Sequence, residues 1–321
     1  MPIATEPNQF DFSRFKTFHI CPRKHFYAYE EGIRSEGNVY TTPGTMFHKA
    51  VEIVVRNVGK VNEDLDELYK EFENLCKVGT LPYEPDLLPY VVQKYFEYYK
   101  KEYVTDETNI LTEYSFHDPI EVGDVVVGVV DQVFEADGLH VLRDIKTTVN
   151  KLKYTVDDVK NNQQLLFYAA YVGGILGIWV DAIEIDEVKL AKLQPVPLLK
   201  NGQPSKDKHQ LELVLLEDYE EELRAQGLFG DSSYNAVLEW LRERGHPLFN
   251  RVRFQVLDDA IIKSNLQDMY ETYKLIKTGN KFRCRSPLCK SCEYKELCDL
   301  DMYNPSEEDR KIYIENITKN P

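Results

Sequence analysis

Apolar residues recur three and four positions apart in several parts of the chain, which is the spacing of one face of an α-helix. This pattern predicts helices over 46–58, 63–77, 87–103, 156–172, 218–244 and 257–278. The first begins just after Pro43-Gly44, a typical helix start. The stripe of the second includes Cys76, which is therefore expected to be a core thiol.

Two valine-rich segments, 124–135 and 139–147, bracket Ala136-Asp137-Gly138. An Asp-Gly pair between such segments is a strong signal for a β-hairpin with a two-residue turn. Counting back from that turn along both strands sets Asp131 opposite Asp144, with Cβ atoms about 4.5–5.5 Å apart. Lys146 lies two residues beyond Asp144, so it projects from the same face of its strand.

Two carboxylates this close repel each other unless a cation lies between them. Mg²⁺ and Mn²⁺ prefer carboxylate oxygen and would remove the conflict. Asp131 also interrupts the apolar run VVVGVVDQVF, where burying an unpaired carboxylate is costly. An exposed hairpin with charged residues on its wet face is the alternative, but the apolar surroundings of Asp131 favour a metal site.

Asp131, followed by Asp144-Ile145-Lys146 in LRDIKTT, resembles the D…(D/E)-x-K signature of the RecB-like nucleases of the PD-(D/E)XK superfamily, which include the Cas4-like proteins. The segment GTMFHKAVE resembles the family's upstream helix, whose histidine, here His48, is an additional metal ligand. Glu113, in ILTEYSF, stands where such proteins often carry an acidic residue.

A further match is QLLFY, which resembles the family's helix after the lysine strand. The Gln and Tyr of that helix, here Gln164 and Tyr168, border the active site and share a helix face because they are four residues apart. The fold that the resemblance implies is an α/β (α+β) restriction-endonuclease-like core, with a central mixed sheet flanked by helices and a helical region bound to an iron–sulfur cluster.

The resemblance also implies a reaction, the hydrolysis of DNA phosphodiester bonds. Mg²⁺ or Mn²⁺ would be held by His48, Asp131, Asp144 and the carbonyl of Ile145, and Lys146 would orient the attacking water or stabilise the developing charge. We expect an exonuclease, 5′→3′ by analogy, that acts on linear ends or single strands in recombination, replication or end processing. The alternatives are a catalytically silent DNA-end-binding scaffold and a redox-sensing iron–sulfur protein.

Cys289, Cys292 and Cys298 are spaced C-x2-C-x5-C, a strong metal signal in a chain without secretory features. The residues alone leave the fourth ligand open between Cys284 and Cys21. The resemblance implies Cys21, because iron–sulfur members of the family join one cysteine before the nuclease core to three after it around a 4Fe-4S cluster. Zinc is the alternative metal.

The 43% hydrophobic content indicates a globular protein, and the absence of a long apolar run or a secretory signal favours the cytoplasm, including that of a host cell if the protein is phage-encoded. The formal charge of −15 argues against a nucleic-acid partner, although local basic clusters exist. The cysteine cluster is expected to gather some of them into one DNA-binding surface, and solvated surface charge is the alternative. The residues concerned are Arg14, Lys16, Arg23, Lys24, Arg283 and Arg285.

The expected organisation has five parts. These are an N-terminal segment (1–40), the nuclease core (41–185), an insertion with a loop expected to be mobile (186–255), a C-terminal helix with the cysteine cluster (256–300) and a polar tail (301–321). Within the insertion, KNGQPSKDK and HPLFNRVRF look like segments of phage-encoded RecB-like exonucleases.

Overall fold

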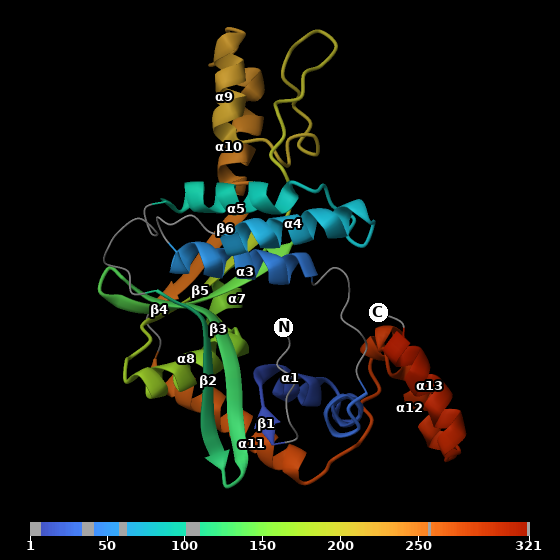
Figure 1. The fold of residues 1–321 in the computed structure, drawn as a ribbon. Coiled ribbons are helices and arrows are strands. Elements are labelled where there is room, and N and C mark those ends of the chain that lie inside the picture. Colours follow the sequence, from blue (N-terminus) through green and yellow to red (C-terminus); the bar gives the residue numbers. More distant parts are fainter. Residues whose placement is uncertain (1–7, 34–41, 58–62, 101–109, 256–257, 320–321) are drawn as a thin grey trace.

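The computed structural model describes residues 8–33, 42–57, 63–100, 110–255 and 258–319. Within them six strands form one mixed sheet, with helices on both faces (Figure 1). The strands are β1 (Gln9–Phe10), β2 (Leu111–Glu121), β3 (Asp124–Ala136), β4 (Leu139–Thr148), β5 (Ala182–Lys189) and β6 (Phe249–Gln255). The sheet order is β1-β3-β4-β5-β6, and β2 also pairs with β3. The predicted mixed α/β architecture is therefore confirmed.

The long strand β3 organises the centre of the sheet. Antiparallel β2 pairs with nearly all of it, from Asp124 to Val133. The parallel β1 reaches only Val126, and the antiparallel β4 begins to pair only at Gln132, so both lie along the edge of β3 that β2 leaves free. Between these two short ladders, that edge of β3 has no backbone partner among the described strands.

The predicted hairpin is confirmed. β3 and β4 are joined by Asp137 and Gly138, whose φ angles are 55° and 74°. Positive φ at both central residues is the signature of a type I′ turn, which Asp-Gly favours. The pairing runs from Ala136–Leu139 to Gln132–Arg143 in the expected register.

Helices cover the two faces of the sheet in separate groups (Figure 1). One face packs against α3 (Thr42–Arg56), α4 (Glu63–Lys77) and α5 (Leu87–Tyr98), through a core that includes Ile145 and Val188. The other packs against α1 (Phe12–Ile20), α8 (Gln163–Leu176) and α11 (Asp259–Lys277), through a core that includes Leu142 and Ile185. On each strand the two residues named here are an odd number of positions apart, so they point to opposite faces and pack into different cores, as the strand period of two requires.

Two predicted helices are each split in the structure. The helix expected over 156–172 is α7 (Val156–Lys160) followed by α8, because Asn162 caps α8 by accepting a hydrogen bond from Leu165 N. The helix expected over 218–244 is α9 (Leu216–Ala225) and α10 (Asn235–Arg244), separated by a segment in which Gly227 and Gly230 have positive φ. At both places a cap or a turn interrupts the helix although the apolar residues keep their helical spacing.

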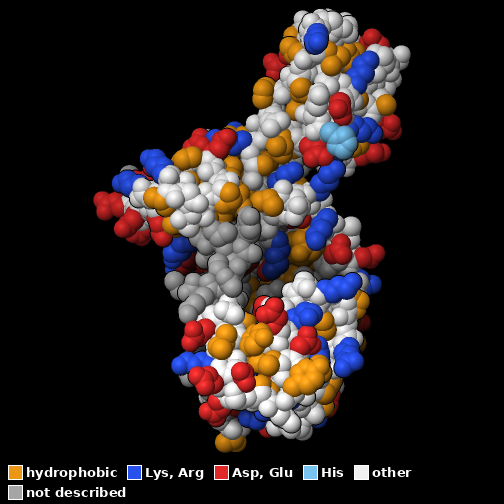
Figure 2. Space-filling view, turned by 90° about the vertical axis from the view of Figure 1, so that its right-hand side faces the viewer, with side chains coloured by type: hydrophobic (Ala, Val, Ile, Leu, Met, Phe, Trp, Pro, Cys, Tyr) orange, Lys and Arg blue, Asp and Glu red, His pale blue; other side chains and the backbone are white. Residues whose placement is uncertain are grey.

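The chain between β5 and β6 forms an arm that projects from the body (Figures 1 and 2). The arm consists of α9, α10 and the loop before them, and it has an apolar core of its own that includes Tyr219, Tyr234 and Leu241. The loop is tied to this core by Tyr219, whose hydroxyl donates to the carbonyl of Ser205. The two ends of the predicted 186–255 insertion lie within the sheet, in β5 and β6.

Segments from the two ends of the chain pack together. After α1 come α2 (Pro22–His25) and a π-helical turn (Phe26–Glu30), and near the C-terminus come a short 3-10 helix (Pro287–Ser291), α12 (Lys295–Leu300) and α13 (Glu307–Lys319). Tyr27 and Tyr294 form the shared core, and the Tyr294 hydroxyl donates to the carbonyl of Ile33. Most of the predicted polar tail is thus the helix α13. No described helix is long and apolar enough to cross a membrane.

Candidate active site

The candidate site lies where β3 and β4 separate. Their ladder ends at Gln132–Arg143, one position before Asp131 and Asp144 would pair. There the carboxylate of Asp131 replaces a backbone acceptor, because its Oδ2 accepts a hydrogen bond of 2.6 Å from Ile145 N. The two aspartates therefore stand at a fork in the sheet, close to the predicted arrangement but not in a regular pair.

Asp144 and Lys146 project together from β4, as predicted for residues two apart. Lys146 Nζ donates to Asp144 Oδ1 at 2.9 Å and lies 2.7 Å from the buried Oδ2, so it pairs with both carboxylate oxygens. From α8, Gln164 Oε1 lies 3.5 Å from the same ammonium, and Gln164 Nε2 donates to the Tyr168 hydroxyl at 3.3 Å. Lys146, Gln164 and Tyr168 are thus connected through polar contacts.

A second group of side chains faces Asp131. His48 Nδ1, from α3, lies 3.3 Å from Asp131 Oδ1 and 3.7 Å from Glu113 Oε1. One ligand atom from each of these three residues lies within 4.8 Å of the others, a geometry that can hold a metal ion. Asp144 lies beside this trio and not in it, and the carbonyl of Ile145, on the same strand, remains a predicted ligand.

Glu113, a candidate from the motif resemblance, reaches the site from β2. Thr112 pairs with Gln132 and Tyr114 with Val130, so Glu113 is the position of β2 that faces Asp131. Its φ is 47°, in the left-handed region that a strand residue other than glycine rarely adopts. Such strain costs about 1–3 kcal/mol and is concentrated at functional sites.

Burial and neighbouring charges perturb the acid–base properties of the site. Burial, with a contribution from Asp131, raises the pKa of Asp144 to about 6 although Lys146 opposes the shift. For Asp131, burial acts in the same direction, but His48 and the N–H of Ile145 prevail and hold its pKa below the ordinary value. Burial alone would lower the pKa of His48, but Asp131 and Glu113 outweigh it and raise that pKa to about 10.

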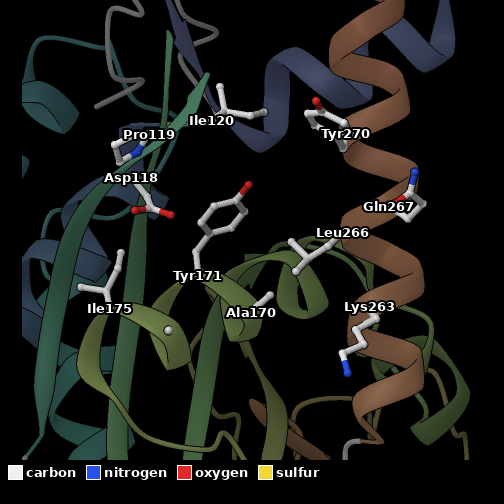
Figure 3. A pocket seen from close by; sticks show the side chains of 11 residues that line it. Asp118, Pro119, Ile120, Ala170, Tyr171, Ile175, Lys263, Leu266, Gln267 and Tyr270 are labelled. Carbon is white, nitrogen blue, oxygen red and sulfur yellow. The ribbon is translucent and has the colours of Figure 1, made fainter. Parts of the chain in front are cut away.

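These residues line a cavity of about 1050 Å³ between α3, α4, α8 and the strands β2 to β4. The start of α3 packs tightly on β4 there, since a Cβ on Gly44 would lie 2.6 Å from Thr147 Oγ1. A second groove, of about 810 Å³, lies between β2, α8 and α11 (Figure 3). Among the described residues that line this groove, Asp118 is the one carboxylate, beside Tyr171 and Leu266, so they offer no set of ligands comparable to that of the first cavity.

The five cysteines outside α4 converge on one small cavity. Its lining contains both candidates for the fourth ligand, so the choice between them remains a prediction. The cysteines are Cys21, Cys284, Cys289, Cys292 and Cys298. Among the described residues, no three of these thiols have sulfur atoms all within 4.8 Å of one another. Cys76 lies apart, half-buried against the core of α3 to α5.

The predicted basic surface needs a correction at Arg14. That side chain is buried, with Nη1 donating to Gln9 O and Nε to His25 Nε2, and it packs over Phe10, so it holds the N-terminal segment together and offers no charge to DNA. Arg23, Lys24 and Arg283 do come together, around the cysteine cavity. Arg285, two residues after Arg283 in the sequence, is exposed.

Comparison with known proteins gives one family. The PD-(D/E)XK nuclease superfamily matches residues 9–299. No curated protein matches the chain. Among solved structures, one titled "Crystal structure of SSO0001" is 13% identical, with a TM-score of 0.28, over 80% of this chain and 96% of that one. The family match spans both the hairpin and the cysteine segments, and the chain belongs to the PD-(D/E)XK nuclease superfamily.

Proposed function

We propose that this protein is a divalent-metal-dependent DNA exonuclease of the RecB-like, Cas4-like type. The superfamily suggests a metal-dependent nuclease. The observation that supports the assignment to this site is the convergence of Asp131, Asp144, Lys146, His48 and Glu113 on one cavity. Exonuclease action, 5′→3′ polarity and a role in recombination, replication or end processing rest on the resemblance of the motifs.

The residues present fit a Mg²⁺ or Mn²⁺ ion. The buried carboxylate of Asp144, which is paired with Lys146, lies beside His48, Glu113 and Asp131, and these three residues offer ligand atoms close together. Carboxylate oxygen is what these ions prefer. We therefore propose His48, Glu113, Asp131 and Asp144, with the carbonyl of Ile145, as the ligand set.

When bound, the ion would supply positive charge to the phosphate and lower the pKa of the attacking water. The protein's own groups then have separate tasks. The N–H of Ile145 fixes the Asp131 carboxylate. Lys146, held by Asp144 and in reach of Gln164, places a positive charge where negative charge develops on the phosphate.

The test uses end-labelled linear DNA and covalently closed circular DNA, with Mn²⁺ or with EDTA. We expect the wild type to degrade linear DNA only with Mn²⁺ and to spare the circles, and Asp144→Ala to be inactive. Asp118→Ala, which removes a carboxylate from the second groove, is the matched control and should remain active. Cleavage of the circles would instead indicate an endonuclease, and intact DNA in every wild-type reaction would favour the silent DNA-end-binding scaffold.

We further propose that Cys21, Cys289, Cys292 and Cys298 bind a 4Fe-4S cluster. These four thiols line one small cavity, and the assignment of the cluster rests on the resemblance of the cysteine motifs; zinc is the alternative metal, because thiolates bind it as well. Arg23, Lys24 and Arg283 line this cavity, where Lys24 is paired with Glu293 and Arg283 with Asp299.

A further inference from the structure

A row of three side chains on α3 connects the candidate site to the strand that carries Glu113. His48, Glu52 and Arg56 follow one another at intervals of four, so they lie along one face of the helix. His48 contacts the Glu113 carboxylate, with Nδ1 and Oε1 3.7 Å apart. Glu52 lines the same cavity and is only 7% exposed.

Arg56 reaches β2 immediately before Glu113. Its Nη2 donates to the carbonyl of Thr112 at 3.2 Å, and its Nη1 lies 2.6 Å from Glu52 Oε1. The guanidinium therefore joins a buried carboxylate of α3 to the backbone of β2. A planar group with several donors can hold both partners at once, which a lysine ammonium cannot do with the same geometry.

Beside the candidate site, one residue of β2 departs from strand geometry. Thr112 and Tyr114 keep their places in the ladder with β3, whereas Glu113 between them has a φ of 47°. An ordinary strand conformation at this position would direct the carboxylate elsewhere. Contacts that fix the neighbouring peptide groups therefore decide where the Glu113 carboxylate lies.

We propose that Glu52 and Arg56 are positioning residues that hold Glu113 in its metal-binding conformation. Two residues of α3 contact this part of β2, since His48 lies against the Glu113 carboxylate and Arg56 donates to the preceding carbonyl. This inference rests on the proposed metal-dependent function. It adds that the affinity for the metal ion depends on a side chain that does not itself touch the ion.

Lys49 provides a matched control. It also pairs with Glu52, at 2.8 Å, and its side chain is 55% exposed against 57% for Arg56. Within the described part of the chain, the Arg56 guanidinium donates a hydrogen bond to β2 and the Lys49 ammonium does not. Lys49→Met and Arg56→Met thus remove the same charge from the same helix, but only Arg56→Met releases Thr112.

The experiment measures Mn²⁺ affinity by calorimetry, together with thermal unfolding of the metal-free protein. We expect Arg56→Met to weaken Mn²⁺ binding by about tenfold or more, as loss of outer-shell partners does, with Lys49→Met near wild type. Arg56→Lys should resemble Arg56→Met in Mn²⁺ binding while keeping the wild-type melting temperature, so a fold defect is distinguishable from a metal-site defect.

A double-mutant cycle identifies the route of the effect. In a Glu113→Gln background, Arg56→Lys should cause little further loss of Mn²⁺ affinity, because Arg56 acts through Glu113. Equal losses in both backgrounds, or no loss in either, would overturn the positioning role. A wild-type protein that binds no Mn²⁺ would instead refute the proposed function itself, which is a separate outcome.

Discussion

Asp144 is a buried carboxylate that lies near a second carboxylate, Asp131, and is paired with Lys146. The pKa of Asp144 is raised to about 6. The pKa of His48 is also raised, to about 10. The hairpin register suggested Asp131 and Asp144, whereas Glu113 was suggested only by the resemblance of its motif, because β2 was not predicted as a strand.

The perturbed pKa values predict how metal binding depends on pH. For each proton that the ion displaces, the Mn²⁺ affinity rises about tenfold per pH unit. Below about pH 6 both Asp144 and His48 are protonated, and above it only His48 is. Mn²⁺ affinity should therefore rise steeply from pH 5 to 6 and less steeply from pH 6 to 8.

Calorimetric titrations across this range measure both slopes. In Asp144→Asn the steeper segment should disappear, since no proton is then displaced at that position. An affinity that did not change between pH 5 and 7 would contradict the protonation states assigned to these two residues.

Gly128 is required for close packing behind the site. A Cβ there would lie 2.5 Å from the Phe116 ring and 3.0 Å from Tyr168 Cε1. Gly128→Ala should therefore lower the free energy of unfolding by about 1–3 kcal/mol through overpacking. Urea denaturation measures the change. Gly174→Ala, on α8 with nothing within 4 Å of the added Cβ, should be neutral or stabilising, and equal losses in both variants would refute the argument.

At the scale of elements, the sequence predicted those whose signal is local. The Asp-Gly turn specified the β3–β4 hairpin and its register, and α4 matches its predicted bounds of 63–77. β5 and β6 were not predicted, because both carry charged residues, of which the acidic ones in β5 are buried and the arginines in β6 are half-buried. Glu184 and Asp186 on β5 are fully buried, and only partners distant in sequence explain how they are accommodated.

Those partners form an ionic network across β4, β5 and β6. Glu184 is paired with Arg143, Arg251 and Arg253, and Arg143 Nη1 also donates to Gln132 Oε1 on β3. The network spans the strands that carry the candidate site. Since the chain brings these charges together only after the sheet forms, no sequence window reveals it.

Removing the central carboxylate should be costly. Glu184→Ala removes the carboxylate that pairs with the fully buried Arg143, and we expect a loss of about 3–5 kcal/mol in the free energy of unfolding. The comparison is Glu97→Ala, which removes a carboxylate from an exposed pair with Lys94 and should change stability by less than about 0.5 kcal/mol. Chemical denaturation measures the free energy of unfolding of both variants. Similarly small changes in the two would show that the network contributes little to stability.

At the scale of the whole molecule, the cysteine cavity joins residues from both ends of the chain. Cys21 stands at the start of α2 and Cys298 lies in α12. Arg14 shows a limit of sequence reasoning at this scale, because its charge suggested DNA binding and only the packing of the N-terminal segment reveals its burial. On the face shown in Figure 2, positive and negative side chains are interspersed over the arm.

Cluster binding can be tested by metal analysis of protein purified without oxygen. We expect iron and acid-labile sulfide in the wild type and in Cys284→Ser, and neither in Cys21→Ser. Loss of iron from Cys284→Ser alone would make Cys284 the fourth ligand, and stoichiometric zinc in place of iron would contradict the cluster. Cys76→Ser, away from the cavity, controls for the substitution itself.

The most direct test of the account is the cleavage rate of Lys146→Ala on linear DNA at saturating Mn²⁺, measured with its Mn²⁺ affinity. Lys263→Ala, which removes a lysine from the second groove, is the control. We predict that Lys146→Ala cleaves at least about 100-fold more slowly without weaker Mn²⁺ binding, while Lys263→Ala cleaves like the wild type. A Lys146→Ala variant that cleaves at the wild-type rate would contradict the assignment of this cavity as the active site.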